Sequence, residues 1–87
     1  MAKRITKAQA VTLAKLKDNV REAQHATFEA ATTVAGPDHT RRLDDACRIA
    51  PEAAERYRAA LVALDDFERD LVAAGRAYRA GGLVLTY

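Results

Sequence analysis

The sequence predicts an all-α protein: an antiparallel hairpin of two long helices, with a short intervening helix and a short extended C-terminal tail, in one domain over residues 1–87. Three observations predict this fold. Twenty of the residues are Ala, the strongest helix former. Apolar residues recur at alternating steps of three and four over two long stretches, as in amphipathic helices. Gly36-Pro37 and Gly81-Gly82 mark the expected ends of these stretches.

The first long helix is expected over residues 6–35. Thr6 can serve as its N-cap, and Gly36 followed by Pro37 should end it. At 1.5 Å per residue its length is about 45 Å. Its apolar stripe consists of Leu13, Leu16, Val20, Ala23, Thr27, Ala30 and Val34.

A short helix is expected over residues 38–50, with Asp38 as its N-cap and Cys47 on its apolar side. The second long helix is expected over residues 51–80, because Pro51 suits a first helical turn. Two long helices of equal length, joined by a compact corner, should fold back on each other. The apolar stripe of the second consists of Ala54, Tyr57, Leu61, Leu64, Phe67, Leu71, Ala74 and Tyr78.

The tail over residues 83–87 is uncharged and rich in β-favouring side chains. Three interpretations remain open for it. The tail packs over the open end of the helical hairpin, adds as a strand to a neighbouring molecule, or is disordered.

The Ala-rich composition predicts helices that form readily but bury little apolar area. Cys47 is the only cysteine, so no internal disulfide can staple the fold. We therefore expect stability to come from self-association or from docking on a larger protein, with a homo-oligomer as the leading expectation.

Positive charge is concentrated at the start of the chain. Residues 1–21 hold six basic side chains and one acidic one, whereas the remainder holds eight Arg and eleven acidic residues. A basic arm on a mildly acidic body suggests an anionic partner, although a Lys-rich surface helix also serves solubility. The candidate DNA contacts are Lys3, Arg4, Lys7, Lys15, Lys17, Arg41 and Arg42.

Catalytic and metal-binding patterns are weak, so the sequence predicts no enzyme, no cofactor and no metal site. Glu22, His25 and Glu29 share a helix face, but a di-iron bundle needs a second copy of such a motif. His39 follows Asp38 with nothing that marks a nucleophile or an oxyanion donor. No glycine-rich loop precedes a helix as phosphate binding requires.

The N-terminus has basic residues but no continuous apolar run, so no secretory signal is expected. No stretch reaches the roughly 18 apolar residues that span a bilayer. We therefore expect no membrane partner and a cytoplasmic location in the host cell interior, which suits an unpaired thiol.

The stretch 38–50 contains Leu43 and the run Ala46-Cys47-Arg48, and a long helix then leads to Gly75. This pattern resembles the middle of the small terminase subunits of phages. The resemblance implies a non-enzymatic, oligomeric DNA-packaging adaptor that hands viral DNA to a separate motor ATPase. Its Lys-rich arm would touch DNA, and its Ala-rich seams would build the oligomer. Unlike many such proteins, the chain has no Trp before the turn.

The leading prediction is thus a phage or mobile-element protein that acts by binding, with DNA packaging as the named role. The first alternative is a protein–protein interaction module without nucleic acid, such as a virion component or an inhibitor of a host defence complex. The second is a metal-dependent helical-bundle enzyme with Glu22 and His25 at a dimer axis. The partner surface of the first alternative would comprise Val62, Val72, Leu83, Val84, Leu85 and Tyr87.

Overall fold

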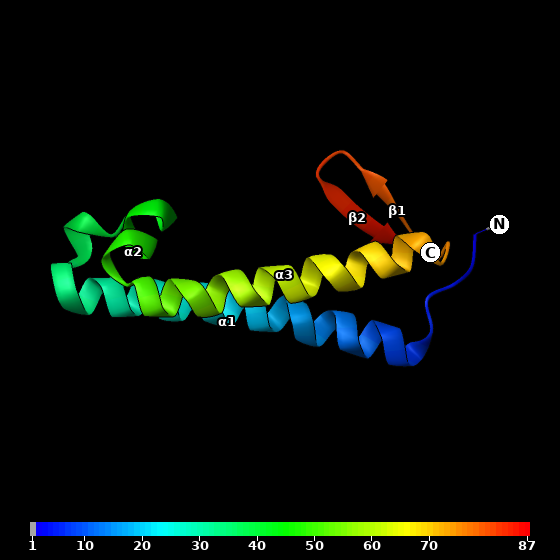
Figure 1. Cartoon of the computed structure of the whole chain (residues 1–87), viewed down its shortest axis with the longest axis horizontal. Helices are drawn as coiled ribbons and strands as arrows, with labels where there is room; N and C mark the ends of the chain where they lie inside the picture. Colours follow the sequence, from blue (N-terminus) through cyan, green and yellow to red (C-terminus); the bar gives the residue numbers. More distant parts are fainter. Residues whose placement is uncertain (1) are drawn as a thin grey trace.

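The structure is a computed structural model that describes residues 2–87. Over these residues the chain is mostly helical and ends in a small antiparallel sheet, so the prediction of a mainly α-helical fold is confirmed (Figure 1). The elements in chain order are α1 (Lys7–Ala35), the 3-10 helix η1 (Pro37–His39), α2 (Leu43–Ile49), α3 (Pro51–Ala73), β1 (Ala77–Ala80) and β2 (Leu83–Thr86).

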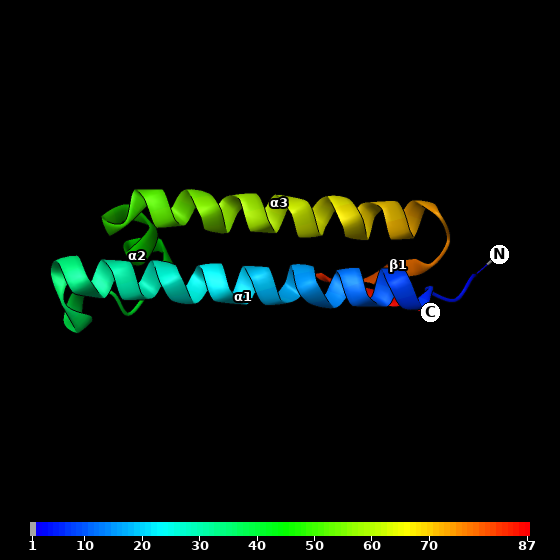
Figure 2. The same ribbon diagram turned by 90° about the horizontal axis from the view of Figure 1, so that it is seen from below.

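Helices α1 and α3 lie side by side and run antiparallel, so that they form one elongated layer (Figure 2). Helix α2 and the β1–β2 hairpin both lie on the same face of this layer, at its opposite ends (Figures 1 and 2). The molecule measures 51 × 25 × 15 Å. Within residues 2–87, no helix is both long and apolar enough to cross a membrane.

Helix α1 begins with the cap that its sequence predicts. The Thr6 hydroxyl accepts a hydrogen bond from the Gln9 amide at 3.1 Å, and the Gln9 side chain accepts one from the Thr6 amide at 3.0 Å. This reciprocal capping box satisfies two amides that have no partner within the helix. Gly36 follows the last turn with φ 86°, a conformation that glycine adopts without steric cost.

The corner between α1 and α3 differs from the single helix predicted over residues 38–50. Asp38 lies in η1 and is not an N-cap; α2 begins only at Leu43. The buried Thr40 hydroxyl explains the interruption, because it lies 2.9 Å from the Thr32 hydroxyl and donates to the Gly36 carbonyl at 3.3 Å. These bonds hold the corner against the end of α1 in a non-helical conformation.

Helix α3 ends at Ala73, so the predicted helix over residues 51–80 is too long. The Arg76 amide donates to the Leu71 carbonyl at 2.9 Å, and the Gly75 amide donates to the Val72 carbonyl at 3.0 Å. With Gly75 at φ 73°, these bonds form a Schellman motif, which terminates a helix. The expectation of equal lengths is therefore also wrong: α1 has 29 residues and α3 has 23.

Residues beyond this cap form a β-hairpin within the chain. Ala80 pairs with Leu83 across Gly81-Gly82, and the φ of 62° at Gly81 is typical of a two-residue type II′ turn. The Gly pair therefore turns two strands instead of ending a helix. The tail is extended, as predicted, but its strand partner is the preceding segment of the same molecule.

The buried core is small and lies in two clusters. Leu13, Leu71 and Ala77 form the first, where α1, α3 and the hairpin meet. The second, under α2, contains only Ala as fully buried apolar residues: Ala31, Ala46 and Ala50. Small side chains allow close helix approach but contribute little buried apolar area each.

Candidate functional site

The two faces of the β-hairpin differ in chemistry. Side chains alternate between faces along a strand, and the cross-strand pairs are Ala77–Thr86, Tyr78–Leu85, Arg79–Val84 and Ala80–Leu83. Ala77 is buried and Val84 packs on the first core cluster, so their face is the inner one. The opposite face, which we call the outer hairpin face, consists of Tyr78, Ala80, Leu83, Leu85 and Tyr87.

The outer hairpin face is apolar, aromatic and accessible to solvent. Tyr78 is 41% exposed, Leu83 66%, Leu85 41% and Tyr87 46%. These are four of the eight exposed large hydrophobic side chains among residues 2–87. The two tyrosine rings pack on each other, with centroids 5.1 Å apart and planes tilted by 39°. Clustering of this kind marks interaction sites more often than scattered single residues do.

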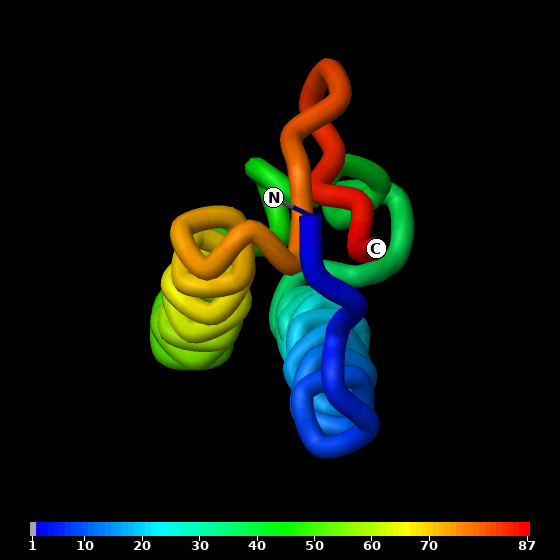
Figure 3. The backbone as a smooth tube through the Cα atoms, turned by 90° about the vertical axis from the view of Figure 1, so that its right-hand side faces the viewer, coloured from blue at the N-terminus to red at the C-terminus, as the bar shows by residue number. Residues whose placement is uncertain are grey.

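The N-terminal arm, residues 2–6, fixes the base of the hairpin. The Lys3 amide donates to the Gly75 carbonyl at 2.8 Å, and the Ile5 amide donates to the Tyr87 carbonyl at 3.3 Å. The Tyr87 amide in turn donates to the Arg76 carbonyl at 3.1 Å. Figure 3 shows the arm rising from α1 to the foot of the hairpin. Main-chain hydrogen bonds from the N-terminal arm and from Tyr87 therefore fix the position of the hairpin that carries the outer face.

The same fold gathers positive charge at this end of the molecule. Arg76 donates from Nη1 to the carbonyl of Arg4, which is 72 residues away in sequence. Lys3 and Lys7 lie on the same arm and helix start. Among residues 2–87, none of these four cations lies within 4.0 Å of a carboxylate. We call Lys3, Arg4, Lys7 and Arg76 the cationic cluster.

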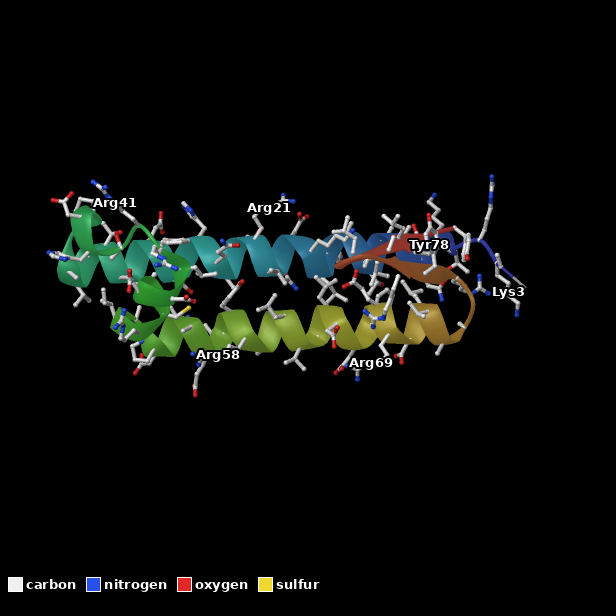
Figure 4. The ribbon with its side chains drawn as sticks, turned by 90° about the horizontal axis from the view of Figure 1, so that it is seen from above. Lys3, Arg21, Arg41, Arg58, Arg69 and Tyr78 are labelled. Atoms are coloured by element: carbon white, nitrogen blue, oxygen red, sulfur yellow. The ribbon has the colours of Figure 1, made fainter. Side chains whose placement is uncertain are left out.

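The predicted DNA contacts fall into two separate groups. Lys15 and Lys17 lie on α1 beyond the cationic cluster, on the same half of the helix. Arg41 and Arg42 lie in the corner at the other end of a molecule 51 Å long (Figure 4). Arg41 is also 3.7 Å from the Asp38 carboxylate, which reduces the positive charge there. The sequence analysis missed Arg76, because its proximity to the arm arises only from the tertiary fold.

The predicted partner residues are divided as well. Val72 and Val84 pack against the first core cluster, so neither is a free contact residue. Val62 is 59% exposed on α3. Ten residues separate Val62 from Val72, which places them about 80° apart around a helix. Of the predicted partner residues, the structure therefore brings Leu83, Leu85 and Tyr87 together, whereas Val62 lies apart from them on α3. Tyr78 and Ala80 complete the outer hairpin face.

The side chains considered for catalysis or metal binding are dispersed. His25 Nε2 lies 3.0 Å from the Glu29 carboxylate on the solvent side of α1. Cys47, expected on the apolar side of its helix, is half-buried beside a shallow groove that Leu43 and Tyr57 also line. Among residues 2–87, no three His, Cys, Asp or Glu side chains are placed to hold a metal ion.

Comparison with known proteins found no match to a family model, to a curated protein or to a solved structure.

Proposed function

We propose that the protein works by binding, as a protein–protein interaction module whose contact surface is the outer hairpin face. The observation that carries this proposal is the gathering of Tyr78, Leu83, Leu85 and Tyr87 on one face of two strands. A virion component or an inhibitor of a host defence complex would use such a surface. Interaction sites are enriched in Tyr, which supplies a large contact area with few rotatable bonds.

The hairpin presents these side chains in an ordered arrangement. Its inner face packs on the first core cluster through Ala77 and Val84, and the arm ties its base through the bonds to Gly75 and Tyr87. A surface that is already ordered loses less conformational entropy when a partner binds. Both features favour a constitutive binding face.

A photo-crosslinking amino acid tests this proposal. We expect the crosslinker at position 83, in place of Leu83, to give a covalent protein adduct in cells that produce the protein. The same group in place of Val62 should give none, because Val62 has similar exposure, 59% against 66%, but lies on α3, outside the outer hairpin face. Gel migration and mass spectrometry of the adduct provide the readout. Equal labelling from both positions, or none from position 83, would refute the outer hairpin face as the contact surface.

Binding of DNA, as an oligomeric packaging adaptor similar to small terminase subunits, is the second candidate function. The cationic cluster favours it, since four basic side chains from the arm, α1 and the segment after α3 lie at one end of the molecule without carboxylate partners among residues 2–87. Contacts from Lys and Arg to phosphates supply most of the affinity of non-specific DNA binding. The terminase-like role itself remains a prediction.

A salt-dependent gel shift tests the DNA proposal. Replacing Lys3, Arg4, Lys7 and Arg76 together by Ala should weaken the shift of duplex DNA at low salt and make the remaining binding less dependent on salt. Each lost phosphate contact lowers the slope of log affinity against log salt by about 0.9, so the slope should fall by about 3 to 4. The matched control replaces Arg41 and Arg42 by Ala at the other end of the molecule and should retain the shift. Equal losses from both variants, or no shift for the unmodified protein, would contradict this surface.

A further inference from the structure

The chain exposes more surface than a compact protein of its mass. Its accessible surface is 6224 Å², whereas compact monomers of 9.5 kDa expose about 5,000 Å². Its radius of gyration is 15.7 Å, against about 12 Å for a compact domain of 87 residues. The surplus of about 1,200 Å² exceeds the roughly 800 Å² that each partner contributes to a standard protein interface. The surface available therefore suffices for a partner of similar size.

The outer hairpin face has the composition that a symmetric interface needs. In a two-fold dimer the same patch meets itself, so a charged residue near the two-fold axis approaches its own like charge. None of the five side chains of the outer hairpin face is charged. Arg79 lies on β1, but its side chain belongs to the inner face, because it pairs with Val84. Arg76 and the rest of the cationic cluster lie at the base of the hairpin, whereas the tip is the neutral pair Gly81-Gly82.

An antiparallel arrangement of two hairpins keeps these cations apart. Each strand has four residues, a length of about 13 Å at 3.3 Å per residue. When the tip of one hairpin lies over the base of the other, each cationic cluster lies beside a neutral Gly-Gly turn. The two clusters then occupy opposite ends of the interface, and their repulsion is screened by distance and salt.

We infer that the partner on the outer hairpin face is a second copy of this chain, with two hairpins stacked face to face about a two-fold axis. This inference rests on the proposed protein-binding function and names its partner. Sheets stacked about 10 Å apart would cover Tyr78, Leu83, Leu85 and Tyr87 of both copies. It would also give the two-stranded sheet, which is marginal alone, a second buried face.

The area of the patch sets the expected strength of the dimer. From the exposed fractions of its four large side chains, the patch offers roughly 400 Å² per copy, about 800 Å² in total. This is below the 1,200 Å² or so of stable complexes and falls in the range of weak, reversible ones. We therefore expect a dimer that dissociates in the micromolar concentration range.

Sedimentation velocity over a roughly hundredfold dilution series provides the first test. The unmodified chain should shift from dimer to monomer on dilution. The double variant Leu83→Ser with Leu85→Ser should be monomeric throughout, with its helical circular dichroism unchanged. The matched control, Val11→Ser with Val62→Ser, alters two side chains of similar exposure on the helices and should dimerise as the unmodified chain does. A monomeric unmodified chain, or loss of dimer in the control, would overturn the inference.

Disulfide trapping gives a second measurement that does not disturb the patch as strongly. In a Cys47→Ser background, Leu85→Cys places one thiol at the centre of the outer face, on β2 between Leu83 and Tyr87, the residue that follows the strand. With oxidised glutathione it should form a disulfide-linked dimer, and Val62→Cys in the same background should not. If the chain is monomeric and position 83 crosslinks to another protein, this inference fails and the proposed binding function stands.

Discussion

Replacing Leu71 by Ala is expected to lower the free energy of unfolding by about 3 kcal/mol, the largest effect of any single substitution we propose. Leu71 is 2% exposed and belongs to the cluster with Leu13 and Ala77. It is one of only two large side chains among the buried apolar residues of the described chain. Its truncation leaves a cavity where α1, α3 and the hairpin meet, because the surrounding side chains relax only partly into the space.

The loss is large relative to the stability of a chain this size. Domains have about 0.05–0.15 kcal/mol per residue, so 87 residues give about 4–13 kcal/mol in total. The Leu71→Ala variant should therefore melt about 10–20 °C lower. Thermal and urea unfolding followed by circular dichroism measure this change, at one fixed protein concentration because self-association contributes to apparent stability.

Val62→Ala on the same helix is the control. Val62 is 59% exposed, and exposed substitutions of this kind usually change stability by less than about 0.5 kcal/mol. A comparable destabilisation by the two variants would show that the cluster around Leu71 is not the centre of the fold. It would also remove the basis for describing the hairpin as anchored on that cluster.

The helical part of the fold could be read from the sequence because its signals are local. The Thr6 and Gln9 side chains that form the capping box are three residues apart, and Gly36-Pro37 ends α1 within two residues of the helix. The hydrophobic periodicity over α1 locates its buried side at Leu13 and Thr27, whereas Val34 of the predicted stripe is 74% exposed. Such features depend on the nearest turns of the chain, which sequence patterns capture.

The predicted end of the second long helix was wrong for a physical reason. Ala74 and Tyr78 continue the three-four spacing of the preceding helix, so the pattern does not break where the structure does. Gly75 breaks the helix through its positive φ, but a single glycine inside a helical pattern is compatible with either outcome. The hairpin signal was present, since Gly81-Gly82 separates two segments whose apolar residues pair as Tyr78–Leu85 and Ala80–Leu83.

Of the candidate site, the sequence predicted only the residues that lie in the tail, 83–87. Leu83, Leu85 and Tyr87 were expected to contact a partner, whereas Tyr78 was assigned to a helix seam and Ala80 to its end. Because these two residues belong to β1, they share the outer face with the tail. Arg76 joins the basic arm only through the return of the chain over α3, a contact between residues 72 positions apart. No local pattern in the sequence reports that contact.

Replacing Ala31 by Leu is expected to destabilise the protein by about 2 kcal/mol and to release α2 from the helical layer. Ala31 on α1 and Ala46 on α2 are both 0% exposed and lie in one cluster. A larger side chain at this position has no space to occupy unless α2 moves. Helix α2 has seven residues, too few to remain helical without this packing.

The thiol of Cys47 reports the release of α2 directly. Cys47 lies on α2, is half-buried and is the only cysteine in the chain, so its rate of reaction with a thiol reagent should rise when α2 leaves the layer more often. The Ala31→Leu variant should react several-fold faster than the unmodified chain. Ala26→Leu, at an exposed position of the same helix, should leave both the rate and the stability unchanged. An unchanged labelling rate in Ala31→Leu would contradict this prediction. It would mean that the packing of Ala31 with Ala46 does not hold α2 in place, because the cluster would then accommodate a Leu side chain without moving α2.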